Sequence, residues 1–220
     1  MPPSFTVHRV GNESELVVVI ENFAADPGAL RDDAATRAFA ARDDHYPGIK
    51  APAPDTDVAA QPAVLRPIVR DVFGADAIRV LDVCYSIVTA APDQLALAQR
   101  LPHFDGLEPG GLALMHYLVP GGCDGTSFYR HRATGFETID HARSTPYFAQ
   151  LNADMRSHGQ PPRAYLNGNT QTFECIGHFE GHYNCALVYR GNILHSGAIS
   201  AESPLSVDPR TGRLTITGFF

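Results

Sequence analysis

The sequence predicts a mainly β domain in which helices from the N-terminal third pack on a double-sheet β core. Short segments rich in β-branched and aromatic residues recur from residue 78 to the C-terminus, separated by Gly, Pro and Asp. Evenly spaced short strands of this kind are typical of a sandwich or a barrel. No internal repeat or long linker divides the 220 residues. We therefore expect a single domain over 1–220, with a support region at 1–77 and the β core at 78–220.

The N-terminal region reads as a strand followed by two helices. Residues 16–20, LVVVI, form a compact β-branched run that predicts a buried strand. Asp26 is suited to cap a helix and Pro27 to its first position, and helical spacing continues through ALRDDAATRAFAAR. Four prolines in 45–62 predict a surface loop. A second helix is expected over 64–73, ending at the glycine that follows.

The remaining two thirds of the chain supply the strands of the core. A helix is expected over 144–158, with Ser144 or Thr145 as its cap. The segments with strand character are 78–90, 112–119, 125–132, 171–179, 183–191 and 213–220.

The composition disfavours several classes of function. A formal charge of −7 and a pI near 5.7 argue against nucleic-acid binding, which usually requires a basic surface. No apolar run approaches the roughly 18 residues that span a bilayer, and the opening MPPSFTVHRV lacks the features of a signal peptide. Four scattered cysteines without a CxxC pair predict reduced thiols rather than a thiolate zinc site. We expect a soluble, cytoplasmic protein, and the sequence leaves its oligomeric state open.

Three residues form a candidate metal site. His103 and Asp105 are two positions apart, so in an extended strand their side chains project from the same face. His195 follows a distant apolar strand, and facing sheets bring such remote segments together. Two imidazoles and one carboxylate are typical of non-haem Fe(II) oxygenases. The sequence therefore predicts an iron site, with O₂ as the molecule to be activated.

A second pair of residues suits a dicarboxylate co-substrate. Arg213 opens the last strand, and a buried arginine binds a carboxylate through two parallel hydrogen bonds. Tyr117 lies on the strand after His103 and Asp105, and its hydroxyl is suited to bind the same carboxylate. We expect these two residues to anchor the far end of a keto acid.

The motifs HFD, LALMHYLVP, GTSFYRH, NCALVYRGNILHSG and TGRLTITGFF follow one another in this order, after the opening VVVIENFAADPGALRDDA. In these motifs the chain resembles the Fe(II)/2-oxoglutarate-dependent dioxygenases of the prolyl-hydroxylase-like group over nearly its whole length. The resemblance implies a double-stranded β-helix (jelly roll), with iron on His103, Asp105 and His195. It also implies 2-oxoglutarate on Arg213, assisted by Tyr117.

The segment between His195 and Arg213 is longer than in close prolyl hydroxylases, which makes Arg210 an alternative anchor for 2-oxoglutarate. The position of Arg213 at the start of an apolar strand favours Arg213, because Arg210 lies in a Pro/Gly turn.

The resemblance implies hydroxylation of a substrate with release of succinate and CO₂. Asp105 argues against halogenation, because halogenases of this group lack the carboxylate ligand. We expect a small-molecule substrate, such as an amino acid or a natural-product intermediate. The alternatives are a peptidyl side chain as substrate, a cupin-type metal-binding jelly roll that does not use 2-oxoglutarate, and a non-catalytic binding domain.

Further residues are candidates for contacts around the site. Arg130 and Arg132 share a face of one strand and are suited to an acidic group of the substrate, and His116 is suited to line the pocket. Asn184 is expected to support the metal ligands by a hydrogen bond. The loops at 45–62, 133–170 and 200–212 are the expected pocket walls.

Overall fold

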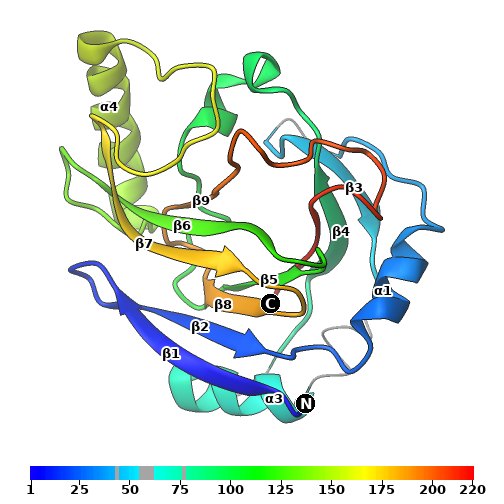
Figure 1. Ribbon diagram of the computed structural model, residues 1–220. Coiled ribbons are helices and arrows are strands. Elements are labelled where there is room, and N and C mark those ends of the chain that lie inside the picture. Colours follow the sequence, from blue (N-terminus) through cyan, green and yellow to red (C-terminus); the bar gives the residue numbers. More distant parts are fainter. Residues whose placement is uncertain (43–44, 55–61, 76–77) are drawn as a thin grey trace.

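Two antiparallel sheets form the body of the computed structural model, which describes residues 1–42, 45–54, 62–75 and 78–220 (Figure 1). The larger sheet has the order β1-β2-β8-β5-β10-β4-β3, and the smaller has the order β7-β6-β9. This arrangement confirms the mainly β prediction and is consistent with a sandwich or jelly roll, whereas the double-stranded β-helix stays a prediction. The strands are β1 (Ser4–Val10), β2 (Glu15–Glu21), β3 (Gly48–Pro52), β4 (Asp82–Val88), β5 (Leu112–Tyr117), β6 (Cys123–His131), β7 (Phe173–Gly181), β8 (Ala186–Arg190), β9 (His195–Gly197) and β10 (Leu214–Phe219).

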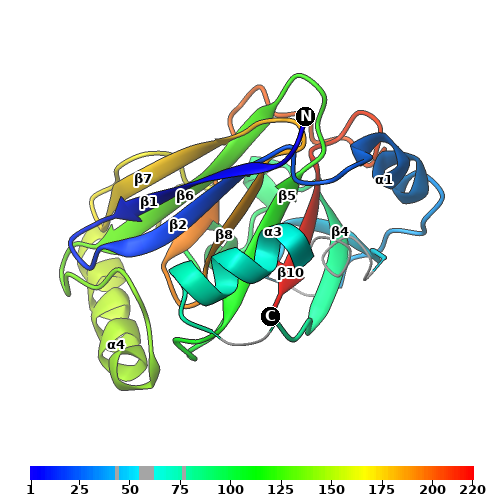
Figure 2. The same ribbon diagram turned by 90° about the horizontal axis from the view of Figure 1, so that it is seen from below.

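Side-chain alternation along the strands separates three apolar layers. On the outer face of the larger sheet, residues such as Tyr85 and Ile216 pack with α1 (Pro27–Ala34) and α3 (Pro62–Pro67). Between the sheets lie Tyr117, Phe128 and Tyr189 with their neighbours. The third layer joins the smaller sheet to α4 (His141–His158). Figure 2 shows α3 and α4 on different sides of the strands. The two sheets therefore enclose an apolar interior, and helices cover part of the outer face of each sheet.

Some of the predicted helix boundaries are confirmed and others differ from the structure. The Asp26 carboxylate accepts a hydrogen bond from the Ala29 N–H at 2.9 Å, as expected of a cap. The first helix is shorter than its periodicity indicated and ends at Ala34. The expected cap of the last helix was wrong, because Asp140 accepts from the Arg143 N–H at 2.8 Å and the helix starts three residues earlier.

The second predicted helix consists of α3 and a π-helical turn at Ile68–Val72. It ends before Gly74, as expected, and Gly74 adopts a left-handed backbone conformation with φ +73°. Two further short 3₁₀ helices, Pro92–Gln94 and Leu97–Arg100, connect β4 to the segment that carries His103. These connections place that segment beside the smaller sheet.

Three strands were not predicted from the sequence, among them the short β9, which falls between the predicted segments 183–191 and 213–220. β1 is exposed along its length except at Val10, so no apolar alternation marked it. β3 lies inside the predicted loop 45–62, and prolines are tolerated there because β3 is an edge strand. The loop prediction was therefore wrong for 48–52, and the part at 55–61 lies outside the described residues.

The two long sides of the sandwich differ. On one side β1 approaches β7, where the rings of His8 and Phe179 are 5.2 Å apart. On the other side the larger sheet ends in β4 and β3, and the smaller sheet is extended by a backbone bridge between His103 and His195. The segment around His103 therefore lies at the edge of the smaller sheet that is remote from β7.

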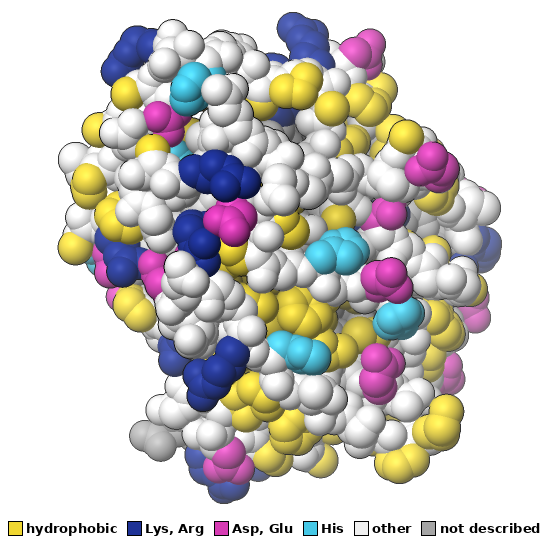
Figure 3. Space-filling model, turned by 60° about the vertical axis from the view of Figure 1, so that its left-hand side comes forward, with side chains coloured by type: hydrophobic (Ala, Val, Ile, Leu, Met, Phe, Trp, Pro, Cys, Tyr) yellow, Lys and Arg dark blue, Asp and Glu magenta, His cyan; other side chains and the backbone are white. Residues whose placement is uncertain are grey.

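The surface is chemically mixed. On the face shown in Figure 3, basic side chains lie beside acidic ones, and hydrophobic side chains gather near several histidines. Within the described part of the chain, no helix combines the length and apolar character needed to cross a membrane.

Candidate metal centre

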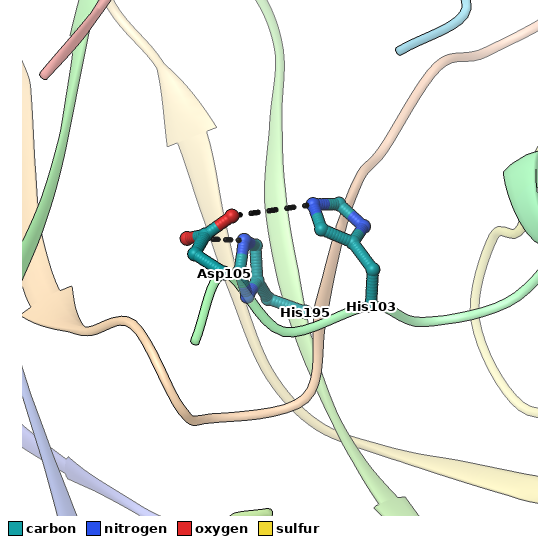
Figure 4. A group of neighbouring side chains, drawn as sticks. All are labelled: His103, Asp105 and His195. Atoms are coloured by element: carbon teal, nitrogen blue, oxygen red, sulfur yellow. Dashed lines mark ion pairs between the residues drawn. The ribbon is translucent and has the colours of Figure 1, made fainter. Parts of the chain in front are cut away.

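His103, Asp105 and His195 converge on one point (Figure 4). The Nε2 atom of His195 lies 3.4 Å from Oδ2 of Asp105, and Nε2 of His103 lies 4.0 Å from Oδ1. One potential ligand atom from each residue lies within 4.8 Å of the others. The structure therefore brings the three predicted ligands together from two segments about 90 residues apart in sequence.

Backbone pairing holds these segments in register. The His103 N–H donates to the His195 carbonyl at 2.8 Å, and the His195 N–H donates to the His103 carbonyl at 2.8 Å. The Asp105 N–H donates to the Gly191 carbonyl at 2.6 Å. His103 and Asp105 thus lie on a short extended segment beside β9, and their spacing directs both side chains to His195.

The ring of His195 has a fixed tautomer. Its Nδ1 lies 2.9 Å from the Ile193 carbonyl, which only accepts, so Nδ1 carries the proton and Nε2 keeps its lone pair. A second hydrogen bond of this kind is what metal-binding histidines usually have. Tyr189 packs edge-on against the ring at 4.9 Å, and the side chain of His195 is only 4% exposed. The Nε2 lone pair is therefore directed at the Asp105 carboxylate.

The surroundings favour neutral histidines. Burial lowers the pKa of His195 to about 4. Desolvation and then the neighbouring His195 lower the pKa of His103, and solvent screens part of this effect because the side chain is 56% exposed. Burial raises the pKa of Asp105, although His103 opposes the change. Neutral imidazoles are the form that binds metals, so both rings are ready to bind near pH 7.

The donor set fits a divalent transition metal. Metal–nitrogen and metal–oxygen bonds of about 2.1 Å at right angles place ligand atoms roughly 3 Å apart. The separations of 3.4 Å and 4.0 Å, and the limit of 4.8 Å for all three ligand atoms, exceed this value, so side-chain movements of about an ångström would bring the three residues to a metal. Two imidazoles with one carboxylate and no thiolate suit iron better than structural zinc, which prefers four closed positions.

Arg213 and Tyr117 lie together on the inner face of the larger sheet. Arg213 is buried, and its guanidinium carbon lies 5.7 Å from the centre of the Tyr117 ring. Its Nε and Nη2 atoms donate to the Asp124 carbonyl at 3.1 and 2.9 Å, and Nη2 also donates to the Gly125 carbonyl at 2.9 Å. Among the described residues, none accepts a hydrogen bond from Nη1. The guanidinium is thus held from one side.

This arginine is near the strand that carries His195. A Cβ atom on Gly197, two residues after His195 on the same strand, would lie 4.0 Å from Nη2 of Arg213. His195, Gly197 and Arg213 therefore face the same interior. A cavity of about 500 Å³ also borders Arg213, and its lining includes Cys123, Glu180 and His182 but none of the three candidate ligands.

The alternative anchor Arg210 lies elsewhere. Its side chain is exposed, its N–H donates to the Asp208 carboxylate at 2.9 Å, and its carbonyl accepts from Arg31 at 3.0 Å. The structure therefore gives Arg213, and not Arg210, the interior position that a buried carboxylate would need.

His116 and Asn184 contact each other and support the fold. The Asn184 amide oxygen lies 3.0 Å from Nε2 of His116 and accepts from the Ala24 N–H at 2.9 Å. The Asn184 amide nitrogen donates to the Ala24 carbonyl at 3.0 Å. These contacts attach the segment after β2 to the turn before β8. The expected roles of His116 in the pocket and of Asn184 behind the metal ligands are not what these contacts indicate, because their partners lie outside the cluster.

Arg130 and Arg132 are also engaged elsewhere. Arg130 lies 2.6 Å from the buried Glu137 carboxylate and 2.9 Å from that of Glu174. Arg132 donates to the Thr170 carbonyl at 3.0 Å. Sequence spacing placed the two arginines correctly on one face but did not reveal these partners, of which Glu174 and Thr170 lie 44 and 38 residues further along the chain. The prediction that they bind a substrate receives no support from this arrangement.

The residues that orient the candidate ligands were not predicted from the sequence. Tyr189 and the Ile193 carbonyl orient His195, and the Gly191 carbonyl positions Asp105. Strand alternation was the available signal for Tyr189, since Leu187 and Tyr189 share the inner face of β8.

The comparison with known families assigns the chain to one group. The model described as "Family of unknown function (DUF6445)" matches residues 1–220. The chain belongs to this family. Because the function of the family is unknown, membership does not assign an activity.

Curated proteins include no significant match to this chain. Among solved structures, an N-substituted L-amino acid dioxygenase from Burkholderia ambifaria AMMD is 10% identical, with 98% of this chain and 93% of that chain covered and a TM-score of 0.46. EvdMO1 is 10% identical, with 98% and 55% covered and a TM-score of 0.37. Both TM-scores lie below 0.5, so the description of the fold rests on its own strand topology.

Proposed function

We propose that this chain is an Fe(II)- and 2-oxoglutarate-dependent oxygenase that hydroxylates a small molecule. The observation that carries the proposal is the convergence of His103, Asp105 and His195, with the Nε2 lone pair of His195 directed into the cluster. Two neutral imidazoles and one carboxylate leave further metal positions open, which is the pattern of non-haem iron oxygenases.

The strand order supports a double-stranded β-helix. The central strands of the larger sheet, β4-β10-β5-β8, face a smaller sheet β7-β6-β9 that the His103 segment extends. Along the chain, β4, the His103 segment, β5 and β6 alternate between the sheets, and β7, β8, β9 and β10 alternate again. This alternation is expected of a jelly roll.

Each residue has a distinct task in this proposal. His103, Asp105 and His195 would hold Fe(II), and Arg213 would bind the distal carboxylate of 2-oxoglutarate through Nη1, with Tyr117 beside it. Bound Fe(II) supplies the activation of O₂ for oxidative decarboxylation of 2-oxoglutarate. Tyr189 and Phe128 form an apolar wall next to His195, at ring distances of 4.9 and 6.3 Å, and exclude water from that side. Asp105 would be the carboxylate ligand that halogenases of this group lack, which supports hydroxylation.

Succinate formation from 2-oxoglutarate tests the proposal. The wild-type protein with Fe(II) and ascorbate is expected to form succinate, and His103→Ala is expected to abolish it. His103 is the preferred ligand to change because its side chain is exposed and its loss should cost little stability. His158→Ala is the matched control, since His158 is an exposed histidine at the end of α4, outside the cluster. Absence of succinate with the wild-type protein, together with absence of 2-oxoglutarate binding, would refute the proposal.

One observation favours a second candidate, a metal-binding jelly roll that does not use 2-oxoglutarate. Three hydrogen bonds from Arg213 are already made to the carbonyls of Asp124 and Gly125, as a purely structural arginine would make. This candidate requires metal binding by the wild-type protein without any effect of 2-oxoglutarate on the metal affinity. Isothermal titration with Zn(II) in the presence and absence of 2-oxoglutarate separates the two candidates.

A further inference from the structure

Lys50 is the only lysine in the sequence. Apart from the histidines, all other basic residues are arginines. It lies at the centre of β3, the edge strand of the larger sheet. Arginine and lysine differ chemically, because the lysine ammonium is a compact charge on a flexible stem.

The strand register directs Lys50 toward the interior. Lys50 pairs with Ser86 on β4, whereas its neighbours Ile49 and Ala51 pair with Ile87 and Tyr85. Those four neighbours belong to the apolar layer on the outer face of the sheet. Because side chains alternate along a strand, Lys50 and Ser86 point to the opposite face, between the two sheets.

The surroundings of Lys50 on that face are polar. The Ser86 hydroxyl lies 3.2 Å from the Thr217 hydroxyl, and Thr215 donates to the Ser86 carbonyl at 3.3 Å. The Lys50 ammonium lies 4.8 Å from the centre of the Tyr46 ring, a distance at which the ring attracts the cation. A polar surface with a cation oriented by an aromatic ring is suited to a charged ligand and not to an apolar one.

Lys50 lies on the same side of the sandwich as the candidate metal ligands. β3 and the His103 segment end their sheets on that side, and the backbone of Lys50 also forms a bridge with Ala40 beyond β3. Because the Lys50 side chain points between the sheets, it faces the interior on the side that holds His103. The interior thus has a cation at this edge, Lys50, and another beside Tyr117, Arg213.

We propose that Lys50 binds a carboxylate of the substrate, so that this chain oxidises a small carboxylic acid, such as a free amino acid, held between β3 and the His103, Asp105 and His195 cluster. The inference rests on the proposed function, in which Arg213 is assigned to the co-substrate. A second anion then needs a second cation, and Lys50 is a cation on the inner face at the edge on the side of His103. A carboxylate at Lys50 would orient the rest of a small substrate toward the metal.

A binding experiment tests this role without turnover. Reductive methylation with ¹³C-formaldehyde labels only Lys50 and the N-terminal amine and keeps both charges, so that two NMR signals report on the protein. Lys50→Arg removes one signal and assigns the other. The protein loaded with Zn(II) and 2-oxoglutarate is titrated with the proteinogenic L-amino acids, each beside its C-terminal amide. We expect at least one amino acid to shift the Lys50 signal, and its amide to leave the signal in place.

Three outcomes of the titration would overturn the inference. These are a Lys50 signal that no probe shifts, a signal that an amide shifts as strongly as its amino acid, and a signal that 2-oxoglutarate alone shifts. The last outcome would assign Lys50 to the co-substrate. The N-terminal signal is the internal control for nonspecific binding.

Selectivity in turnover provides the second arm. With the amino acid that binds best, the wild-type protein is expected to prefer the acid over its amide by roughly 30-fold or more in stimulated succinate formation, as the loss of a charge pair implies. Lys50→Met keeps most of the unbranched side chain without its charge and is expected to reduce the preference to a few-fold, and Lys50→Arg is expected to retain most of it. An unchanged preference in Lys50→Met refutes this inference. A wild-type protein without any 2-oxoglutarate turnover refutes the proposed function instead.

Discussion

The main chains of His103 and His195 hydrogen-bond to each other in both directions, each at 2.8 Å. This reciprocal pair connects the first and last candidate ligands through the smaller sheet and sets their rings 4.3 Å apart at the centroids. The spacing of the rings is therefore established by backbone pairing before a metal binds. Because the side chains are already held close together, metal binding costs little conformational entropy. This favours tight binding of a metal by only three protein ligands.

Asp105→Asn separates metal binding from stability. Burial raises the pKa of Asp105, so the carboxylate is held in surroundings that disfavour its charge. The neutral amide removes that penalty and one metal ligand together. We expect the affinity for Fe(II) or Zn(II) to fall roughly 100-fold or more, as for loss of groups that hold a metal. The urea midpoint of the metal-free protein should remain equal or rise, and a clear decrease would indicate a structural role instead.

Arg213→Met and Arg210→Met distinguish the two candidate anchors for 2-oxoglutarate. We expect Arg213→Met to raise the KM for 2-oxoglutarate roughly 30-fold or more, because a buried charge partner is lost. Arg213→Met should also lower the free energy of unfolding by about 1–3 kcal/mol, since the carbonyls of Asp124 and Gly125 lose their donors.

Because Arg210 is exposed, Arg210→Met should leave the KM and the stability unchanged. Steady-state kinetics and urea titration measure both quantities. A raised KM in the Arg210 variant alone would reverse the assignment.

Gly48→Ala is expected to disrupt the pairing of β3 with β4. An added Cβ at Gly48 would lie 2.0 Å from the Ile87 carbonyl oxygen, a separation that backbone atoms do not tolerate. The strand must shift, and we expect a loss of about 1–3 kcal/mol in the free energy of unfolding. Gly110→Ala is the control, since a Cβ there meets no atom within 4 Å. Equal stability of the two variants would show that β3 is not anchored as described.

Acid should weaken the attachment of the β1–β2 turn through Glu13. Burial raises the pKa of Glu13, but hydrogen bonds from Thr138, Arg143 and Glu137 outweigh it, so the pKa is lower than the ordinary 4.5. A carboxyl group whose pKa is lowered on folding stabilises the protein above its unfolded pKa, and this contribution is lost as the pH falls below about 4.5. Urea midpoints of the wild type should therefore approach those of Glu13→Gln between pH 6 and pH 3. A constant difference across that range would contradict the expectation.

Features that depend only on neighbouring residues could be predicted from the sequence. Asp26 caps its helix as expected because a short polar side chain reaches the next N–H groups without help from the rest of the chain. Most strands of the core were predicted from their apolar runs, the short β9 being an exception. His103 and Asp105 were recognisable because their spacing alone places them on one face of an extended segment.

Roles that depend on distant partners were not predictable in the same way. Arg130 was expected to contact a substrate, but Glu137 and Glu174 bind it, and the pairing of β6 with β7 that brings Glu174 close is not visible in the motif. Asn184 was expected near the metal, but its left-handed backbone, φ +62°, forms a turn whose amide holds Ala24. β3 was missed because its pairing with β4 outweighs the loop-forming tendency of the surrounding prolines.

The most direct measurement of the proposed activity is the fate of oxygen. The wild-type protein with Fe(II) and 2-oxoglutarate is placed under ¹⁸O₂, and the succinate formed is analysed by mass spectrometry. Oxidative decarboxylation by O₂ transfers one oxygen atom to succinate and releases CO₂, so we expect succinate with one ¹⁸O atom from the wild type and none from His103→Ala. Unlabelled succinate, or equal labelling by both proteins, would contradict the assignment of His103, Asp105 and His195 to an iron oxygenase.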